Sequence, residues 1–122
     1  ENNEEHLVYT GVDADGKDFQ SYHLMGLLDN DLAAYARLVA PGICYKETSI
    51  GRVITSIKYR RKELGKQLMQ KAIEETINLY GNAPIRIGAQ LYLKKFYENF
   101  GFVMVGDIYL EDGIEHVIML RK

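Results

Sequence analysis

Apolar and polar positions alternate along the chain in blocks that predict strands first and helices later. Residues 1–20 are polar and rich in turn-forming residues, and the run DADGKD at 13–18 indicates a tight turn. From residue 21 onward, YHLMGLLD and LAAYARLVA are strand candidates on either side of the turn residues 29–31. A short turn between two apolar runs favours a β-hairpin, although the alanines of the second run would also suit a helix.

The middle of the chain predicts a strand followed by a long helix. Residues 41–48 have the composition of a loop, and SIGRVITSI at 49–57 is β-branched, with an imperfect alternation that is typical of a strand buried on both faces. A helical rhythm follows and ends at Gly81-Asn82. Its apolar positions are Leu64, Leu68, Ala72, Ile73, Thr76, Ile77 and Tyr80.

The last third predicts a strand at 85–89, a helix at 91–100 that ends at Gly101, a strand at 102–110, an acidic turn, and a closing strand at 114–122. The element order is therefore β-β-β-α-β-α-β-β. A strand–helix–strand unit implies a parallel pair, and the outer strands imply antiparallel pairs. We expect a single α/β (α+β) domain over 1–122, with a polar segment at 1–20 and a core at 21–122 whose mixed sheet carries helices on its faces.

Composition narrows the function. The formal net charge of −2 argues against a protein that coats nucleic acid, and no apolar run reaches the ~18 residues of a membrane span. Cys44 is the only cysteine, and the three histidines lack metal-ligand spacing, so we expect no metal site. The absence of a visible signal peptide favours a cytoplasmic protein.

The junction between the strand at 49–57 and the long helix has the chemistry of an anion site. The first turn of a helix leaves N–H groups unpaired and carries partial positive charge, which suits a phosphate. Arg60, Arg61, Lys62 and Lys66 surround this point, and Gly65 would allow close approach. A solvated charge run is the alternative, and both stay open. Cations oppose the helix dipole at this end, which favours a bound anion.

The segment AQLYLKKFYENFGF at 89–102 contains a second candidate, Tyr97. It lies on an apolar stripe with Leu93, Phe96 and Phe100. A core tyrosine whose hydroxyl has one partner is the simplest interpretation of that position taken alone.

Taken together, these segments resemble the GNAT superfamily of N-acetyltransferases over residues 22–120. The phosphate-loop pattern of that family is R/Q-x-x-G-x-G/A, with Arg60 at the first position, Glu63 in place of the middle glycine, and Gly65 at the last. In the late motif N-x-x-A-x-x-L-Y-E-K-L-G-F, Gln90 occupies the asparagine position, and FYENFGF matches closely. SIGRV and YLEDGIEHV resemble the ElaA-like branch in particular.

The resemblance implies binding of acetyl-coenzyme A. The pyrophosphate would contact the N–H groups around Lys62 to Gln67, and the pantetheine arm would pair with the strand edge near Thr55, where this strand and the 85–89 strand splay apart. The implied coenzyme-binding residues are Ile54, Thr55, Ser56, Arg60, Arg61, Lys62, Glu63, Leu64, Gly65, Lys66 and Gln90. Tyr97 occupies the general-acid position, and a tyrosine near pKa 10 would stay protonated and could donate to the departing thiolate.

The general base stays open. The family position for a glutamate is Ser49 here, which cannot serve. The candidates are Glu47, Glu111, Asp112, His116 and ordered water. A histidine in a strand is more often structural. Glu111, Asp112 and Gly113 are most simply a hairpin turn, although an acidic lip would also attract a cationic acceptor. Cys44 has no paired histidine in sequence and is interpreted as an ordinary small residue.

The sequence therefore predicts an N-acetyltransferase that passes an acetyl group from acetyl-coenzyme A directly to a primary amine on a small molecule or peptide. The alternatives are an inactive coenzyme A-binding module and a nucleic-acid binder using the basic cluster. Family members usually begin with a strand and one or two helices before the hairpin, and those elements are expected to be missing here. An unpaired closing strand at 114–122 could pair across a homodimer.

Overall fold

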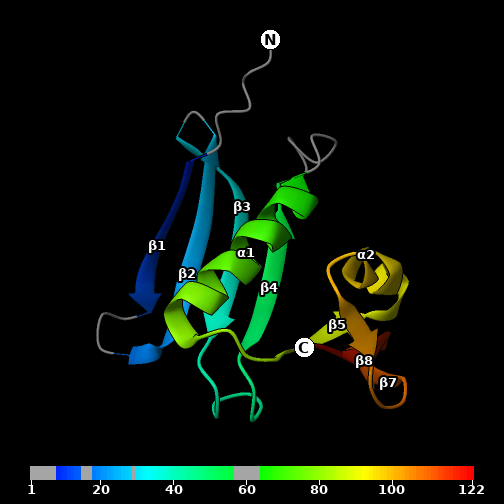
Figure 1. The fold of residues 1–122 in the computed structure, drawn as a ribbon. Coiled ribbons are helices and arrows are strands. Elements are labelled where there is room, and N and C mark those ends of the chain that lie inside the picture. The colour runs from blue at the N-terminus through cyan, green and yellow to red at the C-terminus, as the bar shows by residue number, and fades with distance from the viewer. Residues whose placement is uncertain (1–7, 15–17, 29, 57–63) are drawn as a thin grey trace.

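The computed structural model describes residues 8–14, 18–28, 30–56 and 64–122 (Figure 1). The elements of the first half are β1 (Val8–Ala14), β2 (Asp18–Leu28), β3 (Asp31–Val39), β4 (Ser49–Thr55) and α1 (Leu64–Tyr80). Those of the second half are β5 (Ile85–Gln90), the 3-10 helix η3 (Leu91–Leu93), α2 (Lys94–Glu98), β6 (Phe102–Met104), β7 (Tyr109–Glu111) and β8 (Ile114–Arg121).

The strands form two sheets that meet at one point. The first is an antiparallel meander in the order β1-β2-β3-β4, and in the second β8 pairs with β5, β6 and β7, all antiparallel. The sheets join through a parallel bridge between Thr48 and Ile85, where the Arg86 N–H donates to the Thr48 carbonyl at 2.9 Å. The prediction of a mostly antiparallel mixed sheet with a splayed parallel pair is confirmed.

The predicted hairpin is confirmed as β2 and β3. Asn30 has φ = 70°, which supplies the left-handed conformation of a tight turn. The alanine-rich segment is a strand, as favoured, because Ala36 and Leu38 face the core at period two and are fully buried.

Two predictions about strands were wrong. Residues 8–14 form β1, and β2 begins at Asp18, where a polar, turn-rich segment was expected. Pairing with β2, from Val8 opposite Leu27 onward, makes this stretch a strand. The predicted turn at 13–18 lies partly outside the described residues. The single strand expected at 102–110 is instead β6 and β7, which pair with separate parts of β8.

β4 contains a β-bulge, and the prediction that this strand is buried on both faces was wrong. Between its pairs with Tyr35 and Arg37 the register shifts, so β4 carries one more residue than β3 across this stretch. Arg52 there has φ = 51°, and Ile54 beyond it is 58 % exposed. The imperfect alternation in the sequence therefore reflects the bulge and an open strand edge.

α1 lies across one face of the first sheet, against β3 and β4 (Figure 1). Its buried stripe includes Leu68, Met69 and Ala72, all fully buried in the main core. Gly81, with φ = 96°, ends the helix as predicted, and its N–H donates to the Ile77 carbonyl at 2.9 Å.

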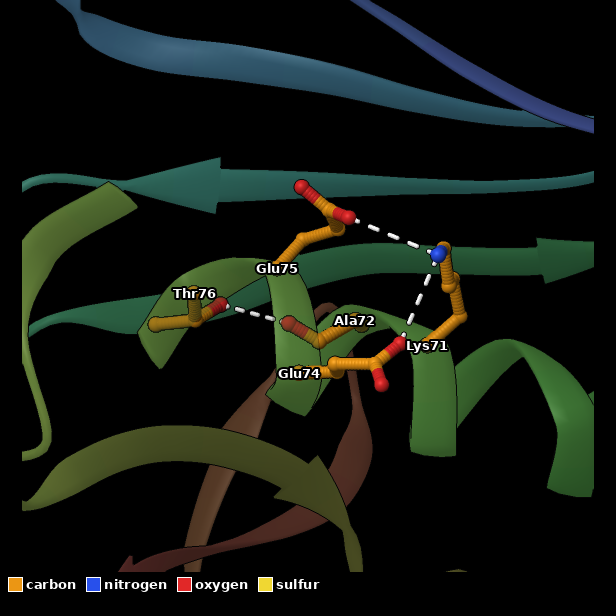
Figure 2. A network of polar contacts seen from close by, with 5 residues as sticks. All are labelled: Lys71, Ala72, Glu74, Glu75 and Thr76. Atoms are coloured by element: carbon orange, nitrogen blue, oxygen red, sulfur yellow. Dashed lines mark hydrogen bonds and ion pairs between the residues drawn. The ribbon is translucent and has the colours of Figure 1, made fainter. Parts of the chain in front are cut away.

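Figure 2 shows a group of polar contacts between residues of α1. On the outer face Lys71 forms ion pairs with Glu74 and Glu75, and the buried Thr76 hydroxyl donates to the Ala72 carbonyl at 2.7 Å. No helix in the described part of the chain is long and apolar enough to cross a membrane.

The late helix and the closing strand differ in part from expectation. Residues 91–100 contain η3 and then α2, and Gly101 with φ = 93° follows the helix as predicted. The expectation of an unpaired closing strand was wrong, because β8 has β5 on one edge and β6 and β7 on the other. A homodimer stays a prediction that this pairing does not test.

Candidate active site

A cavity of about 630 Å³ lies where β4 and β5 diverge. Its walls come from β4, β5, the start of α1, the η3–α2 segment and β8. Consecutive residues of both strands contribute, so the cavity reaches both faces of the splayed pair. The lining residues are Ile50, Gly51, Arg52, Val53, Ile54, Thr55, Gly65, Ile87, Gly88, Ala89, Gln90, Tyr92, Leu93, Phe96, Tyr97 and His116.

The predicted coenzyme strand borders this cavity. Ile54 and Thr55 line it, and the described edge of β4 that faces β5 has no ladder partner beyond the Thr48 bridge. The Ser56 N–H donates to the Ala33 carbonyl at 2.8 Å, so this N–H points toward β3 and away from the cavity side of β4. Because successive residues of a strand point their main-chain groups to opposite edges, those of Thr55 point away from β3.

The predicted phosphate site is only partly described. Arg60, Arg61, Lys62 and Glu63 lie outside the described residues. Leu64 is 3 % exposed and packs with Leu28 and Ala33, so its side chain belongs to the core and only its main chain could contact a ligand. Gly65 lines the cavity beside Phe96, and Lys66 is exposed on the first turn of the described helix. Gln90 lines the cavity at the end of β5.

Tyr97 is a core residue, as the simplest interpretation of its sequence position held, and it also lies at the cavity where a general acid was predicted. It is 7 % exposed and makes edge-to-face contacts with Phe96 and Phe102, at centroid distances of 5.1 and 6.1 Å. It also lines the cavity. Burial, with a smaller contribution from Tyr92, raises the pKa of its phenol above 10.0. The phenol therefore stays protonated at neutral pH and can donate a proton.

Glu47 is a poor candidate for a base. Its carboxylate accepts two hydrogen bonds from the Arg86 guanidinium, at 2.8 and 3.1 Å. This pairing, foremost among several causes, lowers the pKa of Glu47 to about 2. A carboxylate with so little proton affinity, held on a guanidinium, is not suited to accept a proton from an amine.

His116 is a better candidate for the general base than Glu47. It lines the cavity, and its Nδ1 lies 2.8 Å from the Ile114 carbonyl oxygen. A carbonyl can only accept, so Nδ1 carries the hydrogen, and in the neutral ring Nε2 has a free lone pair. Asp112 and Gly113 have φ values of 55° and 76°, and they connect β7 to β8 as the predicted hairpin turn.

Two tyrosines near the cavity were not predicted as site residues, because no motif in the sequence marked them. Tyr45 precedes β4 and Tyr109 begins β7, yet both hydroxyl oxygens lie above Gly88 on β5. The Tyr109 ring also lies against His116, at a centroid distance of 5.6 Å. Residues so far apart in sequence meet only through the pairing of β5, β7 and β8. No cluster of three or more potential metal ligands occurs among the described residues.

Comparison with known proteins agrees with this architecture. The model of the acetyltransferase (GNAT) domain matches residues 16–122. A UPF0039 protein of Synechocystis is 44 % identical over 91 % of this chain and 73 % of the relative. Protein ElaA of Escherichia coli is 36 % identical over 98 % of this chain and 78 % of its own length.

Two solved structures share both fold and sequence with the chain. An acyl-CoA N-acyltransferase from Pseudomonas aeruginosa has 39 % identity and a TM-score of 0.79, covering 84 % of this chain and 68 % of that protein. The crystal structure of Escherichia coli ElaA has 36 % identity and a TM-score of 0.79, covering 91 % and 74 %. The chain therefore belongs to the GNAT family of acyl-CoA N-acyltransferases, and ElaA and the UPF0039 proteins are among its homologues.

Proposed function

We propose that this protein transfers the acetyl group of acetyl-coenzyme A to a primary amine by direct attack in a ternary complex. The observation that carries the proposal is the cavity at the splay of β4 and β5, which combines an open strand edge with a buried tyrosine. The acceptor is a small-molecule or peptide amine.

The open edge of β4 suits the coenzyme arm. Pantetheine contains two amides, and an extended chain of amides binds a free strand edge by main-chain hydrogen bonds. Thr55 offers such groups toward the cavity, and Gly65 lies at the same wall near the start of the described helix. The basic residues Arg60, Arg61 and Lys62 precede that helix in sequence and would add charge for the phosphates.

The reaction needs a proton donor and a proton acceptor. Acetyl-coenzyme A supplies the reactive thioester carbon. As the amine nitrogen bonds to that carbon, the carbon–sulfur bond breaks, Tyr97 donates its phenolic proton to the departing sulfur, and the nitrogen gives up a proton to His116 or to ordered water. Because the phenol is a weaker acid than a thiol near pKa 8.5, its proton moves while negative charge develops on the sulfur, and Tyr97 then regains a proton from solvent.

Turnover and binding, measured separately, test the proposal. Release of free thiol from acetyl-coenzyme A is followed with polyamines, amino acids and short peptides as acceptors, and acetylated products are identified by mass. Coenzyme binding is measured by calorimetry. Coenzyme binding together with an acetylated amine supports the proposal. Binding without any acetylated product would indicate an inactive coenzyme A-binding module, and absence of binding would remove the site assignment.

A further inference from the structure

The face of β5 and β8 that is turned away from the core carries side chains to which no coenzyme contact was assigned. On β5, Ile87 and Ala89 are buried in the core, so Gly88 and Gln90 point to the other face. His116 is opposite Gln90 in the ladder, and Tyr109 is opposite His116. Gly88 and His116 both line the cavity, so this face is continuous with it.

Two phenol oxygens converge on Gly88. A Cβ atom built on Gly88 would lie 2.8 Å from the Tyr109 hydroxyl and 3.2 Å from the Tyr45 hydroxyl. The hydroxyls therefore lie directly over the main chain of β5, where any side chain would displace them. The hydrogen of Gly88, which lines the cavity, leaves room for two polar atoms there.

The electrostatics of this face favour a cation. Burial raises the pKa of both Tyr45 and Tyr109, and the carboxylate of Glu111 adds to the rise at each. The two phenols are therefore neutral, and Glu111 lies close enough to act on both. Arg86 is the cation near Tyr45, but Glu47 holds it in a bidentate ion pair. On the β4 side of the cavity the exposed Arg52 is a separate positive charge.

We infer that Tyr45, Tyr109, Glu111 and His116 form the acceptor site, and that this site selects an aliphatic amine that arrives as an ammonium ion. An ammonium offers three N–H donors, whereas phenol oxygens, a carboxylate and the free Nε2 of His116 can all accept. Aromatic faces of tyrosine add a cation–π attraction. This inference rests on the proposed function, because it supplies the second substrate of the same reaction.

The bound ammonium must lose one proton before it can attack. The N–H bond pointing at His116 breaks, its proton passes to Nε2, and the nitrogen keeps the electron pair that then bonds to the acetyl carbon. His116 becomes an imidazolium whose Nδ1–H still donates to the Ile114 carbonyl, and the proton leaves to solvent. After the attack the nitrogen loses a second proton, which His116 accepts once it has passed the first to solvent. Tyr97 gives one proton to the sulfur and regains one from solvent, so an ammonium and a thioester yield an amide, a thiol and one released proton.

The test compares a cationic acceptor with a neutral one. Cadaverine is an ammonium at neutral pH, and aniline is a neutral primary amine of similar size. Two sets of variants change the site: Glu111→Gln removes the negative charge, and Tyr45→Phe combined with Tyr109→Phe removes both hydroxyls. The control is Glu115→Gln, because Glu115 is exposed on the same hairpin but lies on the opposite face of β8 from His116.

For cadaverine, we expect KM to rise about tenfold or more in both sets, as loss of a charge-assisted hydrogen bond predicts. In both sets of variants, the KM for acetyl-coenzyme A and the KM for aniline should stay unchanged. In the control Glu115→Gln, the KM for cadaverine should stay unchanged. Calorimetric binding of cadaverine to the coenzyme A complex should weaken in parallel. His116→Gln should lower kcat more for cadaverine than for aniline, because only the ammonium must lose a proton before it can attack.

The two proposals fail separately. If the natural sequence acetylates amines but cadaverine shows the same KM and affinity in both sets of variants, the acceptor site is elsewhere and only this inference fails. Equal losses for cadaverine and aniline would likewise overturn the selection of an ammonium. If the natural sequence acetylates no amine, the proposed function fails first. Melting temperatures confirm that each variant is folded, and exposed Glu111 provides a change that the fold tolerates.

Discussion

Tyr97 illustrates how one side chain can belong to the core and also line a cavity. Its ring is packed between aromatic neighbours on α2 and β6, while the residue also borders the cavity. Burial fixes the rotamer and raises the pKa of the phenol, and both effects favour a positioned donor that stays protonated.

Tyr97→Phe removes only the hydroxyl, so we expect folding and coenzyme affinity to persist while turnover falls roughly 10²–10⁴-fold, the usual contribution of a positioned proton donor. Single-turnover kinetics with chemistry limiting are the measurement. Tyr9→Phe is the matched control. Tyr9 lies on the distant strand β1, and its buried hydroxyl has no hydrogen-bond partner within the described chain. Natural turnover in Tyr97→Phe would place the general acid elsewhere.

At the scale of elements, the cavity depends on how β4 and β5 are held at one end and released at the other. At the closed end, Thr48 bridges to Ile85, its hydroxyl donates to the Pro84 carbonyl at 3.2 Å, and Glu47 pairs with Arg86. Beyond it the bulge at Arg52 redirects β4. The strands therefore diverge from a fixed point.

The Glu47–Arg86 pair predicts a specific acid sensitivity. Because the pKa of Glu47 is lowered from 4.5 to about 2 on folding, its stabilising contribution is complete above the unfolded value and is lost as pH falls through about 2. Urea unfolding across this range should show Glu47→Gln less stable than the natural protein at neutral pH, with the difference closing toward the acid end.

Glu74→Gln, on the exposed pair with Lys71, is the control and should show little difference at any pH. A constant difference between Glu47→Gln and the natural protein down to the lowest pH would mean that the pair does not carry this dependence.

The junction before α1 carries the second element-scale prediction. Arg60 and Arg61 lie outside the described residues, and their role stays a prediction from the motif. Changing both to alanine should weaken coenzyme A binding, since each charge-assisted contact contributes about 1.5–3 kcal/mol. Titration calorimetry measures this, with Lys71→Ala on the outer face of α1 as a charge control. An unchanged affinity in the double variant would exclude these arginines from the site.

At the scale of the whole molecule, two sheets joined at one bridge create a cavity open to both faces. α1 lies against the first sheet (Figure 1), and α2 packs on β6 of the second. In the proposed reaction, a cavity that reaches both faces would let the coenzyme and the acceptor enter from different sides. This arrangement suits direct transfer, in which both substrates are bound together.

The proposed direct transfer uses no metal, and the three histidines and single cysteine of the sequence lack metal-ligand spacing. We expect acetyl transfer to be unaffected by prolonged treatment with a chelator. The measurement compares initial rates before and after treatment. Loss of activity that zinc restores would contradict this expectation.

Much of the fold could be predicted because its signals are local. Helical periodicity and Gly81 determine the extent of α1, and the turn at Asn30 determines the β2–β3 hairpin. β1 escaped prediction because a polar strand shows its identity only when it pairs with a neighbour. The division of residues 102–110 into β6 and β7 was not predicted for the same reason, since it depends on which residues pair with β8.

The candidate site divides in a similar way. The sequence by itself determined the order of elements from β2 to α2, the basic residues that precede α1 and the position of Tyr97 on an apolar helix face, because motifs and periodicity are properties of neighbouring residues. Only the tertiary structure decided that Glu47 forms an ion pair with Arg86, 39 residues away. It likewise decided that the hydroxyls of Tyr45 and Tyr109 both lie over Gly88. Contacts between distant segments depend on strand register and on the bulge in β4, and neither leaves a periodic signal in the chain.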